Sequence, residues 1–304
     1  MKKSSTFAAN LEIIYNPNKM KTIKLLALML VALVGMTACS DDDNNESKLI
    51  IEPIEPGYIF VTSGYFTNMY YGNNAVLTVD NKDGKYSAKF SDPQWGEAIF
   101  EDIQIDNVSG TVSGTGTLTM VYRGKEGTYN AGLSGSFNNN IIITLPEVMG
   151  GTTITLYKGE APLACLLNGS HIGTNSVMVG GTMGPYDADI TCKVSANPDG
   201  TINIEIPEYE LHDTAIGNLT VGKVTIKNIA YDEEKKAFYS QYAQDDLKEH
   251  IKIEGKMTID GDYPFAADSF IQIEQTEAGI KFTDSFSFGS MPFAIVSTFE
   301  TVAE

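Results

Sequence analysis

Apolar and polar residues alternate along most of the chain after about residue 57. In the segment TINIEI, Ile202, Ile204 and Ile206 fall on one face, while Asn203 and Glu205 fall on the other. The same two-residue period recurs in TGTLTMVY, KVTIKNI, KIEGKMTID and SFIQIEQ. Because successive side chains of a strand point to opposite faces, this period predicts half-buried antiparallel strands. Helical periodicity is confined to residues 232–250, where we expect one or two turns in a connection.

The two halves of the chain carry the same order of signals. NKDG at 81–84 precedes the strand-like KYSAKF, and NPDG at 197–200 precedes TINIEI. Asp-Gly between alternating runs predicts a tight hairpin, because the turn needs residues that tolerate positive φ. Each half closes with two long strands around a Gly/Met turn, at 141–159 and 280–300. The repeat is far longer than a solenoid unit and predicts tandem all-β sandwiches or barrels.

Two segments of the second half carry a family resemblance. They are NPDGTINIEIPEYELHDTAIGNLTVGKVTIKNIAYDEEKKAFYSQY and FSFGSMPFAIVSTFE. They resemble the calycin-like β-barrel domains of bacterial surface lipoproteins, which are antiparallel barrels related in shape to lipocalins. The first half shows the resemblance through its hairpin and closing strands only. The resemblance implies two tandem antiparallel calycin-like β-barrels, over residues 57–160 and 167–300, following a signal peptide and an acidic tether.

The resemblance implies no active site. The chain also departs from lipocalins, because its single Trp95 lies in Pro-Gln-Trp-Gly rather than in the Gly-x-Trp that opens their first strand. A small hydrophobic ligand is therefore expected by fold analogy alone.

The N-terminal region has the pattern of a secretory signal. A short basic segment precedes ten apolar residues, Leu25 to Val34, which are too few for a comfortable membrane span. Met-Thr-Ala-Cys then resembles the lipobox of bacterial lipoproteins, which implies that Cys39 carries the lipid, a palmitate-type acyl anchor, and begins the mature chain. A plain secretory cleavage site is the alternative. Residues 1–38 are thus the expected signal peptide, with Met20 as the expected true start.

Acidic residues directly follow the expected lipid site. Ser-Asp-Asp-Asp at 40–43 opens a predicted tether over 39–56. This stretch resembles an export signal in lipoproteins of Gram-negative gut anaerobes, which implies display on the outer face of the outer membrane. A solvated acidic tether explains the same residues, and both explanations can hold together.

Charge narrows the range of partners. The chain carries a formal charge of −18, and removing the five Lys and one Glu of residues 1–38 leaves −22. This excess of negative charge argues against nucleic acid as a binding partner, because its binding needs Lys and Arg side chains to neutralise the phosphates. It also argues against adhesion to an anionic bilayer through protein surface, so the bilayer is expected to hold the chain through the acyl group on Cys39. Cys165 and Cys192 could form a disulfide or remain two separate buried thiols.

Catalytic motifs are missing from the sequence. It contains no Gly-x-Ser-x-Gly elbow, His-Glu-x-x-His helix or phosphate-binding Gly-Lys-Ser/Thr loop. We therefore expect no enzyme, no cofactor and no metal. The loop predicted at 208–213, Glu-Tyr-Glu-Leu-His-Asp, could hold a divalent ion through its carboxylates and the imidazole of His212, but an exposed acidic loop is the plainer interpretation. Tyr209 could also stack on a sugar or fill the core.

Asp284 is the most unusual position in the pattern. The alternation places its side chain on the same face as Ile280, Phe282, Phe286 and Phe288. A carboxyl inside a barrel would have a raised pKa and could orient a ligand. A bulge that turns it to solvent is the plainer account.

Two functions follow from these features. The first is a surface lipoprotein that acts as a non-catalytic binding module for a small molecule or glycan, with Asp284, Tyr209 and His212 as candidate ligand residues. The alternative is a structural or adhesive surface protein with filled barrels and no small-molecule ligand. The sequence does not determine the oligomeric state.

Overall fold

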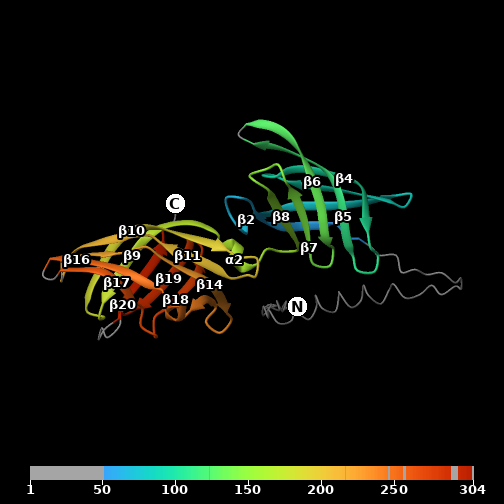
Figure 1. Cartoon of the computed structure of the whole chain (residues 1–304). Coiled ribbons are helices and arrows are strands. Elements are labelled where there is room, and N and C mark those ends of the chain that lie inside the picture. Colours follow the sequence, from blue (N-terminus) through green and yellow to red (C-terminus); the bar gives the residue numbers. More distant parts are fainter. Residues whose placement is uncertain are drawn as a thin grey trace, which may run out of the picture. The chain divides into compact units, whose positions relative to one another are not determined.

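The computed structural model describes residues 51–302, except 123, 216, 246, 256–257 and 289–293. The expected signal peptide, Cys39 and the tether up to residue 50 lie outside the described residues. Within the described part, two closed eight-stranded antiparallel barrels follow each other along the chain (Figure 1), and this confirms the predicted all-β fold. The described residues include no helix that is both long enough and apolar enough to cross a membrane.

The first barrel is an up-and-down meander in which each strand pairs with the next. The pairing of the last strand with the first closes it, with Phe60 opposite Thr155. Its strands are β1 (Ile54–Thr62), β2 (Met69–Lys82), β3 (Lys85–Asp92), β4 (Gly96–Ile105), β5 (Thr111–Tyr122), β6 (Lys125–Ser136), β7 (Asn140–Leu145) and β8 (Thr152–Lys158). Asp83 and Gly84 join β2 to β3 with φ of 53° and 82°. The Asp-Gly hairpin predicted from the sequence is therefore present.

Side chains fill the interior of the first barrel. A side chain that lines a space wide enough for water keeps some accessible surface, even when that space is sealed from solvent. Thirteen inward-facing side chains keep none: Ile59, Val61, Ala75, Leu77, Phe90, Ala98, Phe100, Leu118, Ile141, Ile143, Leu145, Ile154 and Leu156. Eight strands enclose an interior that side chains can fill, and here they do so.

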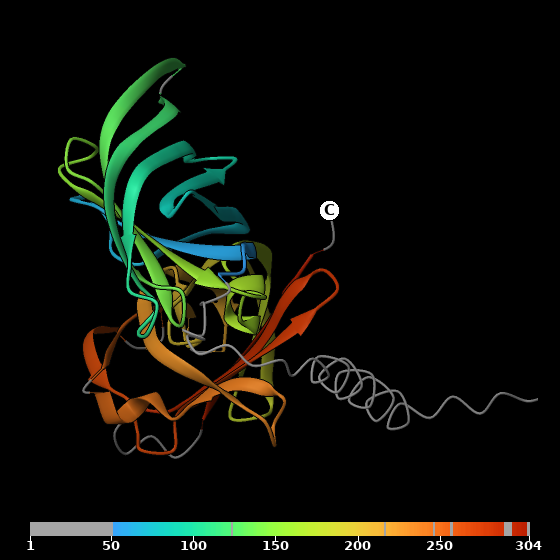
Figure 2. The same ribbon diagram turned by 90° about the vertical axis from the view of Figure 1, so that its right-hand side faces the viewer.

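The second barrel is also a meander, but four of its strands are interrupted. Its closed ring contains β9 (Gly169–Val179), β10 (Met183–Ala196), β11 (Ile202–Ile206), β14 (Val224–Asp232), β15 (Ala237–Ser240), β18 (Phe270–Thr276), β19 (Gly279–Phe286) and β20 (Ile295–Thr301). A separate sheet contains β12 (Tyr209–Thr214), β13 (Gly217–Val221), β16 (Lys248–Gly255) and β17 (Thr258–Pro264). In chain order, β11 leads into β12, β13 into β14, β15 into β16 and β17 into β18. Four wall strands thus each leave the ring partway and continue in the four-stranded sheet. The strands of the second barrel run from yellow-green to red in Figure 2.

Side chains also fill the closed ring of the second barrel. Its inward-facing side chains without accessible surface are Val177, Cys192, Ile202, Ile204, Ile226, Ile229, Ile271, Ile273, Ile280, Phe282 and Phe299. The four-stranded sheet adds an apolar face of its own, formed by Leu211, Leu219, Val221, Ile251 and Ile253. The second barrel therefore consists of a closed ring filled by side chains and of the four-stranded sheet into which four of its strands continue.

Short helical segments occur only in connections within the described residues. The region 232–250 contains one 3₁₀ turn, η1 (Tyr242–Asp245), between β15 and β16, so one helical turn is present and the rest is mainly strand. A four-residue helix, α2 (Leu163–Leu166), joins β8 to β9, and the sequence did not predict it. Propensity patterns of four residues are too short to identify such a turn.

Candidate functional sites: a buried polar cluster and a surface pocket

Asp284 lies inside the second barrel, in the middle of β19. Its pairing with Ile271 on β18 and Ser297 on β20 is regular, and the side chain is 4% exposed. The alternation predicted from the sequence is thus kept, and the expected bulge that would turn the carboxyl to solvent is absent from β19. That interpretation was wrong because it gave the cost of burying a carboxyl more weight than the strand pattern.

A hydroxyl group satisfies the buried carboxyl. The Tyr242 hydroxyl, from η1, donates a hydrogen bond of 2.7 Å to Asp284 Oδ1. Tyr209, at the start of β12, is also buried and lies close enough to Asp284 for the carboxylate charge to raise the pKa of its phenol. Asn175 and Ser297 face the Tyr209 hydroxyl, and Ser297 Oγ donates a hydrogen bond of 2.5 Å to Asn175 Oδ1. The structure therefore brings together two of the three predicted residues, Asp284 and Tyr209.

Glu249 is a second buried carboxyl that the sequence analysis missed. It lies near the start of β16 and is 2% exposed, and its Oε1 has no hydrogen-bond partner among the residues that the structure describes. The segment EHIKIEG places Glu249 on the same face as Ile251 and Ile253, so the same alternation that identified Asp284 could have identified it. We name the set Asn175, Tyr209, Tyr242, Glu249, Asp284 and Ser297 the polar belt.

Burial sets the protonation of both carboxyls. It raises the pKa of Asp284 to about 7, while the hydrogen bond from Tyr242 lowers that pKa in part. Burial, and after it the charge of Asp284, raise the pKa of Glu249 to about 8, against the backbone N–H groups of His250 and Gly222. Burial is also the main reason that the pKa values of Tyr209 and Tyr242 are raised. In water-excluded surroundings without a cation the neutral acid is the stable form, so both carboxyls hold protons more tightly than exposed ones.

His212 lies apart from the polar belt. It belongs to β12, within a strand rather than in the predicted loop, and its ring is exposed on the outer face, where Nε2 lies 3.8 Å from Glu210 Oε2. In the part of the chain that is described, no three His, Cys, Asp or Glu side chains converge in a way that could hold a metal ion. His212 and Tyr209 are three residues apart on the same strand. Because successive side chains of a strand alternate between its two faces, these two point to opposite faces.

The two remaining cysteines are free, buried thiols. Of the two arrangements that the sequence allowed, the separate thiols are therefore present. Burial raises the pKa of Cys165 to about 11 and that of Cys192 to about 12, so neither is a reactive thiolate at neutral pH.

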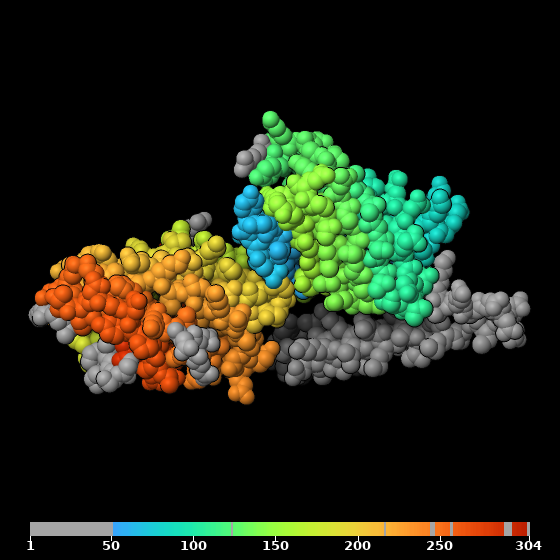
Figure 3. All heavy atoms as spheres, viewed as in Figure 1, coloured from blue at the N-terminus to red at the C-terminus, as the bar shows by residue number. Residues whose placement is uncertain are grey.

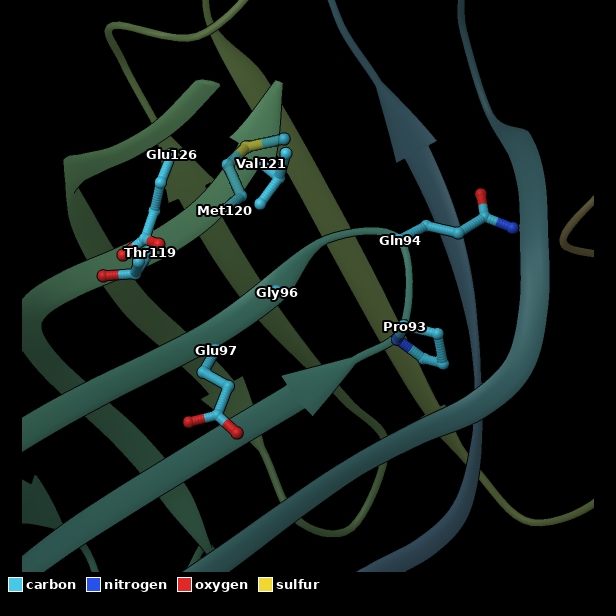
Figure 4. A pocket seen from close by; sticks show the side chains of 8 residues that line it. All are labelled: Pro93, Gln94, Gly96, Glu97, Thr119, Met120, Val121 and Glu126. Carbon is cyan, nitrogen blue, oxygen red and sulfur yellow. The ribbon is translucent and has the colours of Figure 1, made fainter. Parts of the chain in front are cut away.

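The first barrel carries a pocket on its surface. It has a volume of about 330 Å³ and is lined by Pro93, Gln94, Gly96, Glu97, Thr119, Met120, Val121 and Glu126. Figure 4 shows Thr119 on β5, with Glu97 on β4 and Glu126 on β6 as its neighbours, while Pro93 and Gln94 come from the turn before β4. Glu97 is paired with Lys89 at 3.0 Å, whereas Glu126 has no ion pair with any of the described residues. The pocket thus combines apolar side chains with amide, hydroxyl and carboxylate groups.

The pocket adjoins a face of β5 and β6 that carries polar, uncharged side chains. One carboxylate reaches this face: Glu147 Oε1 accepts a hydrogen bond of 2.9 Å from Asn130 Nδ2. In register, Thr119 lies opposite Thr128, Thr117 opposite Asn130, Ser113 opposite Ser134 and Thr111 opposite Ser136. Alternate residues of a strand share a face, so these side chains and Thr115 project outward together, and most are exposed. We name this set the hydroxyl face: Thr111, Ser113, Thr115, Thr117, Thr119, Thr128, Asn130, Ser134 and Ser136. Green atoms of these strands form part of the first barrel's visible surface in Figure 3.

Comparison with known proteins supports the fold. Residues 167–301 match the family model of the calycin-like β-barrel domain. A crystal structure named as a putative outer membrane protein from Bacteroides fragilis is 21% identical, with a TM-score of 0.55, and the alignment covers 83% of this chain and 97% of that one. At this identity the likeness shows the fold alone, and it extends over both barrels.

A second structure is more distant. It is a protein of unknown function from Nostoc punctiforme, 12% identical over 81% of this chain and 94% of that one, and its TM-score of 0.18 supports no argument. Among curated proteins, none matches the chain.

Proposed function

We propose that the protein is a lipid-anchored, surface-displayed outer-membrane protein whose first barrel binds a neutral glycan on its outer face, without catalysis. The location is supported by the lipobox-like Met-Thr-Ala-Cys with its acidic continuation, and by the name of the Bacteroides fragilis protein of the same fold. The binding proposal is supported by the hydroxyl face and the pocket at its end. The observation that carries it is this set of polar, uncharged side chains on two adjacent strands of a chain of formal charge −18.

Because side chains fill the interiors of the barrels, the proposed ligand site lies on the outer surface. Lipocalin-like capture of a hydrophobic ligand needs a hollow lumen, usually several hundred Å³. Thirteen inward-facing side chains of the first barrel and eleven apolar ones of the closed ring of the second keep no accessible surface. A ligand of the first barrel therefore has the surface pocket and the hydroxyl face available, rather than the lumen.

The chemistry of the hydroxyl face matches a neutral polyol. Each Ser or Thr hydroxyl can both donate and accept a hydrogen bond. Asn130 adds an amide whose Nδ2 already donates one hydrogen bond to Glu147, which leaves its second N–H and its oxygen. Outward residues recur about every 7 Å along a strand and about 5 Å across the pair, so a polymer of sugar units can be contacted at several points. Anionic polymers are disfavoured by the strongly acidic chain and by Glu126 in the pocket.

A glycan array with the chain from Ser40 onward tests this function. We expect binding to neutral glycans, with little binding to sulfated or uronate-rich ones. Thr117→Glu places a charge at the centre of the hydroxyl face and should weaken binding at least tenfold, or about 1.4 kcal/mol. Thr283→Glu is the matched control, since Thr283 faces outward on β19 of the second barrel. Absence of neutral-glycan binding in the unmodified protein, or equal loss in both variants, would contradict the proposal.

The same packing also agrees with a structural or adhesive role, in which the outer faces contact another macromolecule and no small ligand is bound. Binding of free oligosaccharides separates the two functions. An adhesive protein would bind an intact host or bacterial surface while failing to bind short neutral glycans in solution.

A further inference from the structure

The polar belt lies where the four wall strands of the second barrel are interrupted. Tyr209 is the first residue of β12 after the break that follows Ile206, and Glu249 is the second residue of β16. Tyr242 lies in η1, the segment that fills the break between β15 and β16. These three side chains therefore come from the part of the chain that leaves the ring.

The other three members of the belt come from uninterrupted strands. Asn175 lies on β9, Asp284 on β19 and Ser297 on β20, and these strands pair with one another in register as part of the ring. The hydrogen bond from Tyr242 to Asp284, and the contact of Tyr209 with Asn175 and Ser297, thus connect the interrupted strands to the continuous wall. The belt is the polar link between the four-stranded sheet and the barrel.

This link contains no described cation. Asp284 is faced by Tyr242 from η1, Tyr209 from β12 and Glu249 from β16, while β9 and β20 contribute the neutral Asn175 and Ser297. The adjacent His250 is turned to the outer face, where its ring contacts Asp260 and Asp262 at 3.3 and 2.9 Å. Two carboxylates in this buried place would repel each other without compensation, whereas two carboxylic acids would not.

We propose that the polar belt is a protonation-controlled clasp, which holds the four-stranded sheet against the barrel while Asp284 and Glu249 are both protonated and releases it when they ionise. Release separates Tyr209, Tyr242 and Glu249 from the wall. It uncovers the aromatic side chains packed beside the clasp, Phe265, Phe286 and Phe288. The clasp lies in the second barrel and does not depend on the glycan site of the first.

Linkage gives the size of the effect. With pKa values of about 7 and 8 in the closed state, against ordinary values of 3.8 and 4.5, ionisation raises the open fraction about a thousandfold between pH 6 and pH 9. The direction is fixed because the closed state binds the protons more tightly than the open state. Closure is therefore favoured by acid and lost as the pH rises through 7 and 8.

Amide hydrogen exchange on the full mature chain tests the clasp. Protection factors, which correct for the intrinsic rise of exchange with pH, should fall by two to three orders of magnitude in β12, β13, β16 and β17 between pH 6 and pH 9. Those of β1–β8 should change much less. Glu249→Gln cannot ionise and should reduce the fall to about tenfold, which is the part that Asp284 alone supplies. Glu274→Gln, an exposed carboxyl on β18, is the matched control and should behave as the unmodified protein.

A second readout keeps the test decisive if the Gln variant does not fold. The unmodified protein should bind a dye for exposed apolar surface, such as ANS, at pH 9 but not at pH 6, reversibly and without loss of strand signal. Protection factors in the four-stranded sheet that stay constant from pH 6 to pH 9, or that fall equally in all strands, would overturn the proposal.

Discussion

Phe100 provides the sharpest test that the first barrel is filled. Its ring has no accessible surface and lies directly over Gly116 of β5, where a Cβ would come within 2.8 Å of the ring. Because Gly116 has no side chain that could move into the vacated space, Phe100→Ala should leave a cavity. Truncation of a buried Phe costs about 3–5 kcal/mol of unfolding free energy, and the limited local collapse favours the upper part of this range.

The neighbouring residue provides the control. Ile99 precedes Phe100 on β4, points outward and is 51% exposed. Ile99→Ala removes apolar atoms of a similar kind that are already partly in water, so we expect a loss of about 1 kcal/mol or less.

The chain contains a single Trp95, which lies buried in the first barrel. Its fluorescence during urea unfolding therefore reports the first barrel separately from the second, which matters because two barrels need not unfold in one transition. A loss under about 1 kcal/mol for Phe100→Ala, or no difference from Ile99→Ala, would refute the packed interior. In a hollow barrel the shorter side chain would create little new cavity, so the free energy of unfolding would fall only slightly.

Three further predictions concern other parts of the chain. The native state holds the Asp284 proton more tightly than the unfolded chain, so stability is full below about pH 4 and falls as the pH rises through 7. Asp284→Asn should remove the part of that fall that lies between pH 5 and pH 9, about 2.7 kcal/mol, measured by circular dichroism in urea at these two pH values. Cys165 and Cys192 should react with a thiol reagent only as fast as the second barrel opens, and equal rates in native and urea-unfolded protein would contradict their burial. Cys39→Ser should abolish incorporation of labelled palmitate and release the protein from membranes, and labelling that persists would exclude the expected lipid site.

The sequence predicted the regular parts of the fold because period-two alternation depends on local chemistry. Strand β19 shows this well, since Ile280, Phe282, Asp284 and Phe286 all point inward as the pattern requires. The Asp-Gly turns were equally predictable, since few residues adopt positive φ. The interruption of four strands was not predictable, because each half of an interrupted strand has the same alternation as an intact one.

The candidate sites depended on contacts between distant segments. Tyr209 and Tyr242 meet Asp284 from positions 75 and 42 residues away, a relation that no local pattern contains. Glu249 was missed although its own strand alternates regularly, because a carboxyl in an acidic protein is usually exposed. His212 was placed with Tyr209 by sequence proximity, and the odd spacing along β12 puts it on the other face.

Mapping of a bound glycan onto the structure tests the central claim most directly. We would titrate the isotopically labelled mature chain with the neutral glycan that binds best on the array, and follow backbone amide signals by NMR. The account predicts shifts confined to the pocket and the hydroxyl face, at residues 93–97, 111–121 and 126–136. Shifts centred on the inward-facing residues Leu77, Phe90 and Ile143, with the hydroxyl face unchanged, would contradict it.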